Sequence, residues 1–287
     1  MESDMPTPPG LARRAVTVHQ DGMARHGDDW LVEEVPVELR YNGVAFAVMM
    51  ATPVDLDDFA YGFSLSEDRV ARASDILGVA TREQAQGHVL DIAISTAVPI
   101  ALAPELARLM PGRSGCGLCG NRRLEEVMRP APPVPDGPVL APDALERARD
   151  ALAQRQPLNA PTGAVHAAAW ASPDGEILCV REDVGRHNAL DKLLGALSRE
   201  GVDLRGGFVL VTSRASYEMV TKTARLGVGV LAAISAPTAL AVELAHASNL
   251  TLAGFVRTGR HVVYSHPRRI PSRGLEASHP ASSTAPS

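Results

Sequence analysis

Residues 208–234 read FVLVTSRASYEMVTKTARLGVGVLAAI, and this stretch decides the fold. The apolar runs near its two ends do not alternate with polar residues, which is typical of strands that are buried on both faces. The segment between them, 215–226, is predicted to be a helix. A buried strand, a helix and a second buried strand predict a parallel or mixed sheet with helices on each side.

The same alternation continues on both sides of this stretch. Towards the N-terminus we expect a helix at about 187–199 and, before it, a hairpin formed by 164–170 and 177–180 around Ser172-Pro-Asp-Gly. Towards the C-terminus we expect a helix at 238–248 and a strand at 251–257. The second half of the chain is therefore predicted to be an α/β domain.

The first half has weaker signals. Residues 35–41 alternate between apolar and polar side chains up to Asn42-Gly43, a type I′ turn signal, and 45–50 resumes beyond it. A short helix is predicted over 55–64 with Asp55 as its cap, and a strand over 89–94. We expect a smaller α+β region here.

Shifts in composition divide the chain into five parts. Proline-rich sequence without regular structure and polar ends are the markers of the boundaries. The parts are a disordered N-terminus (1–28), an N-terminal α+β region with a C-x-x-C loop (29–130), a proline-rich linker (131–142), the α/β domain (143–265) and a disordered tail (266–287).

Composition excludes several classes of protein. The chain has 287 residues, 45% of them hydrophobic and 21% charged, and a formal charge of −5, which argues against a dedicated nucleic-acid binder. Its most apolar segment, 226–247, contains Ser235, Pro237 and Glu243, so we predict no membrane span. No secretory signal is visible, and three cysteines have the wrong parity for a disulfide framework. We predict a cytoplasmic protein with reduced thiols.

Three polar clusters follow predicted strands, at 181–188, 212–218 and 235–238. In open α/β sheets, ligands bind beyond the carboxyl ends of the strands, where helix N-termini favour phosphates. Pro237 suits a first helical position, and Ser235 or Thr238 would cap that helix.

Arginines strengthen the prediction of an anionic, phosphorylated ligand. Arg186, Arg214, Arg257 and Arg260 would add bidentate donors. The alternative stays open, because turns between strands and helices need capping residues whether or not anything binds. His187, taken alone, is more typical of a helix start than of a catalytic base.

Cys116 and Cys119 stand in the stretch RSGCGLCGNRR, residues 113–123. A zinc site needs about four ligands, and no second pair of suitable spacing completes one. A thioredoxin-like redox pair opens a helix directly after a strand, and the glycines here argue against that rigid turn. The remaining cysteine, Cys179, lies in a predicted strand and is expected to be an inert core residue.

A sulfur carrier suits the two thiols best. A free cysteine with a pKa of ~8.5 is mostly protonated at neutral pH, whereas sulfur transfer needs the thiolate. The positive charge of the flanking arginines favours the thiolate. Glycines let the loop move between a donor and an acceptor, and a second thiol helps to release sulfur by exchange. Two structural cysteines in a surface turn remain the alternative.

The chain resembles the FdhD family, the sulfurtransferases required for formate dehydrogenase activity. The resemblance covers about residues 30–265 and combines a glycine-flanked C-G-x-C-G with R-E-D-V-G-R-H-N, which together are highly specific. The matching stretches are EEVPVELRYNG (33–43), SGCGLCG (114–120), REDVGRHNALDK (181–192), SRASYEMVTK (213–222), ISAPTALAVELA (234–245) and GFVRTGR (254–260).

The resemblance implies a function. A cysteine desulfurase would supply sulfur as a persulfide on Cys116, with Cys119 assisting. The sulfur would pass to the molybdenum bis(guanine dinucleotide) cofactor before insertion into the formate dehydrogenase catalytic subunit, with molybdenum or tungsten left open. Residues expected to bind this cofactor are Phe255, Val256, Arg257, Thr258, Gly259 and Arg260, together with the strand-end residues Arg186, His187, Ser213, Arg214, Ser235 and Thr238.

The resemblance also implies a cytidine-deaminase-like three-layer sandwich and a homodimer. Deaminase chemistry is not expected, because His166-Ala-Ala stands where a zinc deaminase needs H-x-E, and we predict no intrinsic metal. Segment 64–69 departs from the family pattern. Two other hypotheses are a guanine-nucleotide cofactor chaperone without sulfur transfer and, ranked last, a zinc-dependent nucleobase hydrolase.

Overall fold

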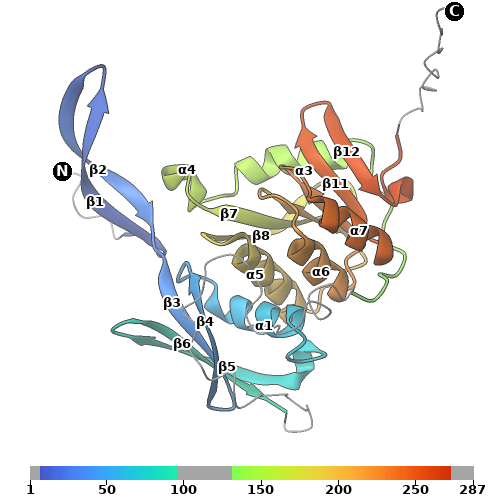
Figure 1. The fold of residues 1–287 in the computed structure, drawn as a ribbon, viewed down its shortest axis with the longest axis horizontal. Helices are drawn as coiled ribbons and strands as arrows, with labels where there is room; N and C mark the ends of the chain where they lie inside the picture. Colours follow the sequence, from blue (N-terminus) through green and yellow to red (C-terminus); the bar gives the residue numbers. More distant parts are fainter. Residues whose placement is uncertain (1–6, 96–130, 273–287) are drawn as a thin grey trace, which may run out of the picture.

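The computed structural model describes residues 7–95 and 131–272. Cys116 and Cys119, the arginines of their loop and the helix predicted from about residue 122 with Asn121 as its cap lie outside these residues. The described chain forms two halves that pack together through helices (Figure 1).

The first half is a four-stranded sheet of order β4-β3-β6-β5 with one helix packed on it, preceded by a hairpin. Its core is formed by apolar side chains such as Leu39, Phe59 and Ile92, all fully buried. The elements are β1 (Leu11–Gln20), β2 (Met23–Val32), β3 (Val35–Tyr41), β4 (Val44–Ala51), α1 (Leu56–Ser66), the 3₁₀ turn η1 (Ala73–Asp75), β5 (Ile76–Gln84) and β6 (Gly87–Ile94).

The β3–β4 turn has the predicted type. Asn42 and Gly43 both have positive φ, 48° and 82°, as a type I′ turn requires. Asp55 occupies the N-cap position of α1, as predicted, but it has left-handed φ and ψ and its side chain makes no capping bond. A cap normally has β-region dihedrals that turn its oxygen towards the first amides. Asp55 instead lies 3.7 Å from Arg181.

The second half is a mixed six-stranded sheet of order β12-β11-β10-β9-β7-β8. Strands β9, β10 and β11 are parallel, and the remaining neighbours are antiparallel. The elements are α3 (Ala144–Ala153), α4 (Asn159–Thr162), β7 (His166–Ala171), β8 (Ile177–Asp183), α5 (Arg186–Arg199), β9 (Phe208–Val211), α6 (Tyr217–Arg225), β10 (Val230–Ala233), α7 (Ala239–Ala247), β11 (Thr251–Arg257), β12 (Arg260–Ser265) and the 3₁₀ turn η2 (Pro267–Arg269).

Helices cover both faces of this sheet, as the apolar strands predicted. Val209 and Leu231 face α5, α6 and α7, whereas Phe208 and Leu210 face α3. All four side chains are fully buried. The result is three layers, helices on a sheet on a helix.

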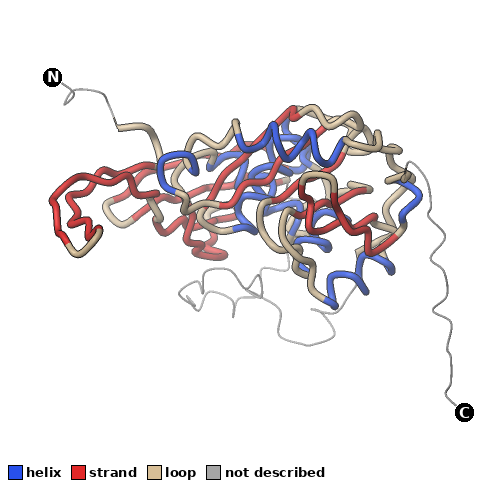
Figure 2. Tube along the Cα trace, turned by 90° about the horizontal axis from the view of Figure 1, so that it is seen from above, coloured by secondary structure: helices blue, strands red, loops and turns tan. Residues whose placement is uncertain are grey.

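Two segments predicted to be disordered contain ordered structure. Residues 11–32 form the β1–β2 hairpin, which extends away from the rest of the molecule (Figures 1 and 2). Its side chains are mostly exposed, so no apolar alternation marked it in the sequence. Beyond residue 265, Arg269 and Ile270 are buried at 2% and 6% exposure.

The proline-rich segment 131–142 has no helix or strand, as predicted, but it does not hang free. Val134 and Leu140 are buried, and the Val134 amide donates to the Ser248 carbonyl at 2.9 Å. The segment is a strap packed on the second half of the chain.

Helices α1 and α5 join the two halves at backbone contact. A β-carbon on Gly62 would lie 1.7 Å from the Asp191 carbonyl oxygen, and one on Gly195 would lie 1.9 Å from that of Asp58. Only glycine fits at both positions, and the close approach sets the spacing of the halves. Among the described residues, no helix has the length and apolar character needed to cross a membrane.

Candidate functional site

The carboxyl ends of β8, β9, β10 and β11 meet at one edge of the six-stranded sheet. Strand β8 runs parallel to β9 because both are antiparallel to β7. The loops after β8, β9 and β10 lead into the N-termini of α5, α6 and α7. We call this edge the crest and define it by residues 184–187, 212–217, 234–238 and 255–260.

Hydrogen bonds between the loops hold the crest together. The Ala215 amide donates to the Ala236 carbonyl at 3.2 Å, and the Thr238 amide donates to the Ala215 carbonyl at 3.0 Å. The Phe255 amide donates to the Ser235 carbonyl at 3.1 Å. The loops after β9 and β10, which carry two of the three predicted clusters, are therefore connected to each other and to the end of β11.

The helix N-termini at the crest are capped differently. Thr238 caps α7, since its hydroxyl accepts the Ala241 amide at 3.3 Å, and Pro237 stands before the cap instead of in the first turn. The residues at the caps of α5 and α6, Gly185 and Ser216, make no capping side-chain bond. First-turn amides of these two helices are thus not occupied by their caps, which suits an anionic ligand.

Three arginines leave positive charge at the crest. Arg214, Arg257 and Arg260 are exposed, and within the described chain none of them pairs with a carboxylate. Among the residues that the structure describes, Arg257 donates to the backbone carbonyls of Ile234 and Val256 and to no side chain. Exposed guanidinium groups without a counter-ion are well suited to bind phosphate oxygens in pairs.

His166 is half-buried beside the crest. It begins β7 at this edge, and burial together with repulsion from Arg186 and His187 lowers its pKa, against a smaller opposing effect of Asp183. In the sequence, His166 was noted only because the residues after it do not complete the H-x-E motif of a zinc deaminase. Burial is the largest cause of this shift and the neighbouring cations add to it, so the neutral form of the imidazole is favoured here.

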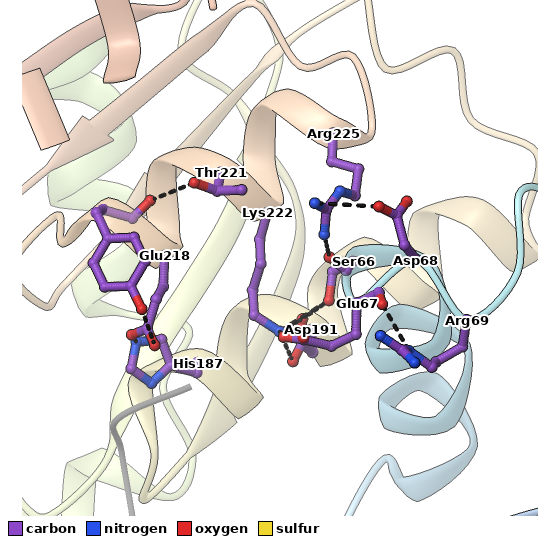
Figure 3. Close-up of polar contacts among 11 residues, drawn as sticks. Ser66, Glu67, Asp68, Arg69, His187, Asp191, Glu218, Thr221, Lys222 and Arg225 are labelled. Carbon is purple, nitrogen blue, oxygen red and sulfur yellow. Dashed lines mark hydrogen bonds and ion pairs between the residues drawn. The ribbon is translucent and has the colours of Figure 1, made fainter. Parts of the chain in front are cut away.

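A buried imidazole–carboxylate pair lies beneath the crest. His187, in the first turn of α5, places Nε2 2.5 Å from Oε2 of Glu218 in the first turn of α6 (Figure 3). The other carboxylate oxygen accepts the Tyr217 hydroxyl at 3.3 Å. His187 stands at a helix start, as the sequence predicted, and its predicted role in cofactor binding stays a prediction. Glu218 was not singled out in the sequence, because a carboxylate is more often exposed than buried.

Most polar residues of the stretch 181–192 are structural. Asp183 and Lys192 are both fully buried and 2.7 Å apart. Both hold the same residue of the first half: the Thr52 amide donates to Asp183 at 3.0 Å, and Lys192 donates to the Thr52 carbonyl at 2.9 Å. Asn188 bridges Asp183 and the Met50 carbonyl. These groups fasten the halves together and are not available to a ligand.

A second buried cluster joins α5, α6 and the end of α1. Lys222 lies 2.7 Å from Asp191 and 2.8 Å from Glu67, and the Ser66 hydroxyl donates to Asp191 at 2.7 Å (Figure 3). Burial opposes the charge on Lys222, but Asp191 and Glu67 outweigh it and raise the Lys222 pKa. Segment 64–69, the departure noted in the sequence, supplies this contact.

The other predicted binding residues differ in availability. Phe255 is 38% exposed and has a φ of 52°, at the irregularity in β11–β12 pairing. Val256 is buried in the sheet, whereas Thr258 and Gly259 are exposed in the turn. Ser213 is buried, and its hydroxyl donates to the Arg214 carbonyl at 3.1 Å.

Cys179 lies in β8 and is half-buried, with its Sγ 3.4 Å from a guanidinium nitrogen of Arg181. Burial raises the pKa of its thiol and so disfavours the reactive thiolate. Over residues 7–95 and 131–272, no group of three or more His, Cys, Asp or Glu side chains is placed to hold a metal ion.

Known proteins resemble this chain over most of its length. The model of the FdhD/NarQ family matches residues 32–271. The sulfur carrier protein FdhD of Cupriavidus necator is 52% identical over 263 residues, 92% of this chain and 91% of the relative. That of Xanthomonas euvesicatoria is 51% identical over 273 residues, 95% of this chain and 96% of the relative.

A solved structure has the same fold. The crystal structure assigned to a formate dehydrogenase accessory protein from Desulfotalea psychrophila superposes with a TM-score of 0.70 at 24% identity. The match covers 92% of this chain and all of that one, 100%. At this level of identity the likeness bears on the fold, and it extends to both halves.

Proposed function

Since the chain belongs to the FdhD/NarQ family, we propose that it is a sulfurtransferase that carries sulfur from a cysteine desulfurase to the molybdenum bis(guanine dinucleotide) cofactor of formate dehydrogenase. The deaminase-like description of the second half, a cytoplasmic location and a homodimer are parts of the same proposal. The observation that carries it is the crest, where helix N-termini meet Arg214, Arg257 and Arg260, which pair with no carboxylate among the described residues.

The chemistry proposed for the thiols is two successive exchanges. The Cys116 thiolate attacks the outer sulfur of the desulfurase persulfide, the sulfur–sulfur bond breaks, and the desulfurase leaves as a thiolate. The Cys119 thiolate then attacks the inner sulfur of Cys116, so that the outer sulfur leaves as hydrosulfide to the acceptor. The two cysteines are oxidised to a disulfide as that sulfur is reduced, and a cellular dithiol returns them to thiols.

The crest is proposed to hold the acceptor by its nucleotide. A guanine dinucleotide carries diphosphates, which helix N-termini and guanidinium groups bind through amide and bidentate hydrogen bonds. Arg214 and Arg260 are the residues best placed for this, because they are exposed and form no ion pair with a described residue. The protein would bind, orient and neutralise the cofactor while sulfur is delivered.

The test has two parts. Incubation with a desulfurase and cysteine should add one sulfur mass to the peptide that contains Cys116, and Cys116→Ala should abolish the gain. Independently, GDP should bind the protein, and Arg214→Ala should weaken this binding about 10-fold or more, as expected for loss of a charge-assisted bond. Absence of added sulfur on the wild type would reject the sulfurtransferase.

A cofactor chaperone is the second candidate. The crest is built from residues outside 96–130, so nucleotide binding needs no contribution from the thiols. If formate dehydrogenase matures normally with Cys116→Ala, the chaperone is correct. Loss of maturation with GDP binding intact supports the sulfurtransferase.

A further inference from the structure

The β11–β12 turn is a short and poorly supported part of the crest. Strand pairing ends at Arg257 opposite Arg260, and only Thr258 and Gly259 lie between them. The pairing register shifts between Gly254 and Arg257, so the ladder behind the turn is irregular. All four residues from 257 to 260 are exposed. Strand pairing alone therefore gives this turn little support.

Helix α3 supplies the missing support. The Gly259 amide donates to Oε2 of Glu146 at 3.0 Å, and Nη2 of Arg149 donates to the Thr258 hydroxyl at 3.0 Å. Glu146 and Arg149 are three residues apart, so they lie on the same side of the helix. Two consecutive residues of the turn are thus held by two side chains of one helix (α3 lies beside the hairpin in Figure 1).

The helix is a rigid base for this contact. The adjoining side of the helix is anchored by Leu145, Ala148 and Leu152, all at most 2% exposed, in the core under the sheet. Arg149 is itself held, since its Nε lies 2.9 Å from the Asp150 carboxylate. Only 15% of the Arg149 side chain is exposed. The turn is therefore tied to the core through α3.

The charges at this contact are arranged so that the arginines of the turn stay available. Glu146 accepts a backbone amide and makes no ion pair with Arg257 or Arg260 among the described residues. Arg149 is compensated by Asp150. Holding the turn by its hydroxyl and its amide leaves its guanidinium groups free of carboxylates, which is what an anion site requires.

We propose that Glu146 and Arg149 are positioning residues of the nucleotide site, which hold the β11–β12 turn so that Arg257 and Arg260 face the ligand's diphosphate. This inference rests on the proposed function. Its physical basis is preorganisation: a turn already fixed in its binding shape loses less entropy when the ligand binds. Loss of the contacts that Glu146 and Arg149 make with the turn should therefore weaken nucleotide binding without removing any group that touches the nucleotide.

The experiment is a calorimetric titration of the full-length protein with GDP. Glu146→Ala should weaken GDP binding roughly 3- to 10-fold, the effect of one ordinary hydrogen bond. Arg149→Ala should act in the same direction. Glu146→Gln should restore affinity, because its amide oxygen still accepts the Gly259 amide. Arg147→Ala is the matched control, since this neighbour on α3 bonds Asp143 and the Asp174 carbonyl instead of the turn.

A second readout separates positioning from general stability. Amide exchange at Gly259 should accelerate in Glu146→Ala while the melting temperature stays within error of the wild type. In reconstituted sulfur transfer, the half-saturating concentration of cofactor should rise at unchanged maximal rate. If Glu146→Ala binds GDP as tightly as the wild type while Arg260→Ala loses GDP binding, the positioning role is wrong but the nucleotide site stands. A wild type that does not bind GDP overturns the nucleotide site itself and the inference with it.

Discussion

Replacing Lys222 by methionine tests whether buried charges hold the two halves together. Lys222 has a side chain only 5% exposed and contacts Asp191, Glu67 and Ser66 at 2.7–2.9 Å. The variant keeps most of the apolar stem but leaves Asp191 buried at 1% exposure without its cation. Breaking a buried pair by removing one partner costs about 3–5 kcal/mol. For a protein of this size the melting temperature should fall by about 5–8 °C.

The double variant Lys222→Met with Asp191→Leu distinguishes an ion pair from simple packing. Because an apolar pair of similar volume often replaces a buried ion pair at little cost, the double variant should be more stable than Lys222→Met alone. Urea unfolding and circular dichroism would measure all four corners of the cycle. Arg205→Met, which removes an exposed pair with Asp203, is the control and should not change the melting temperature. If the two losses simply add, the reasoning is refuted.

Two further predictions follow from the described residues. The pKa of His166 is lower in the folded protein than in the unfolded chain, so the folded protein binds this proton less tightly. Stability is therefore lost as the pH falls from ~6.5 to the folded pKa, and above ~6.5 His166 makes no difference to stability. His166→Gln should therefore melt higher than the wild type at pH 5 and equally at pH 8, and a constant difference across this range would contradict the prediction. Gly62→Ala should destabilise by about 3 kcal/mol, the upper end of overpacking, because its β-carbon meets backbone. Gly78→Ala, with nothing within 4 Å and an ordinary φ, should unfold in urea like the wild type, and equal stability of the two variants would argue against contact between the helix backbones.

Sequence alone predicted the second half of the fold well because its signals are local. The continuous apolar runs of β9 and β10 and the periodic helices between them follow directly from burial on two faces. The Asn42-Gly43 turn was equally local, since positive φ at both positions needs those residue types. The family resemblance, confirmed by the comparisons, added the order of the motifs.

The remainder depended on contacts between distant segments. The β1–β2 hairpin has no buried face, so its residues carried no alternation, and α3 lay in a stretch for which no element had been predicted. Likewise, the polar residues of 181–192 resembled ligand contacts, but Asp183, Asn188 and Lys192 form hydrogen bonds with the backbone of Thr52 and Met50. No rule based on residue spacing shows that the carboxylate of Asp183 will be buried against Thr52, 131 residues away in the sequence.

The glycine positions illustrate the same limit. Gly62 and Gly195 look like ordinary helix residues of low propensity, and only the packed structure shows that each faces the other helix's backbone. The crest, in contrast, was predictable, because parallel strands bring their carboxyl ends to one edge whatever the rest of the chain does. The sequence therefore located this edge of the sheet better than it identified which of its residues are exposed.

The most direct measurement of the central claim follows labelled sulfur through a single turnover. The protein is loaded with ³⁵S from a desulfurase, freed of donor, and mixed with the molybdenum bis(guanine dinucleotide) cofactor. We predict that the label moves from the protein to the cofactor and that excess GDP slows this transfer. Label that stays on the protein, or that is lost equally fast with and without the cofactor, would contradict the account.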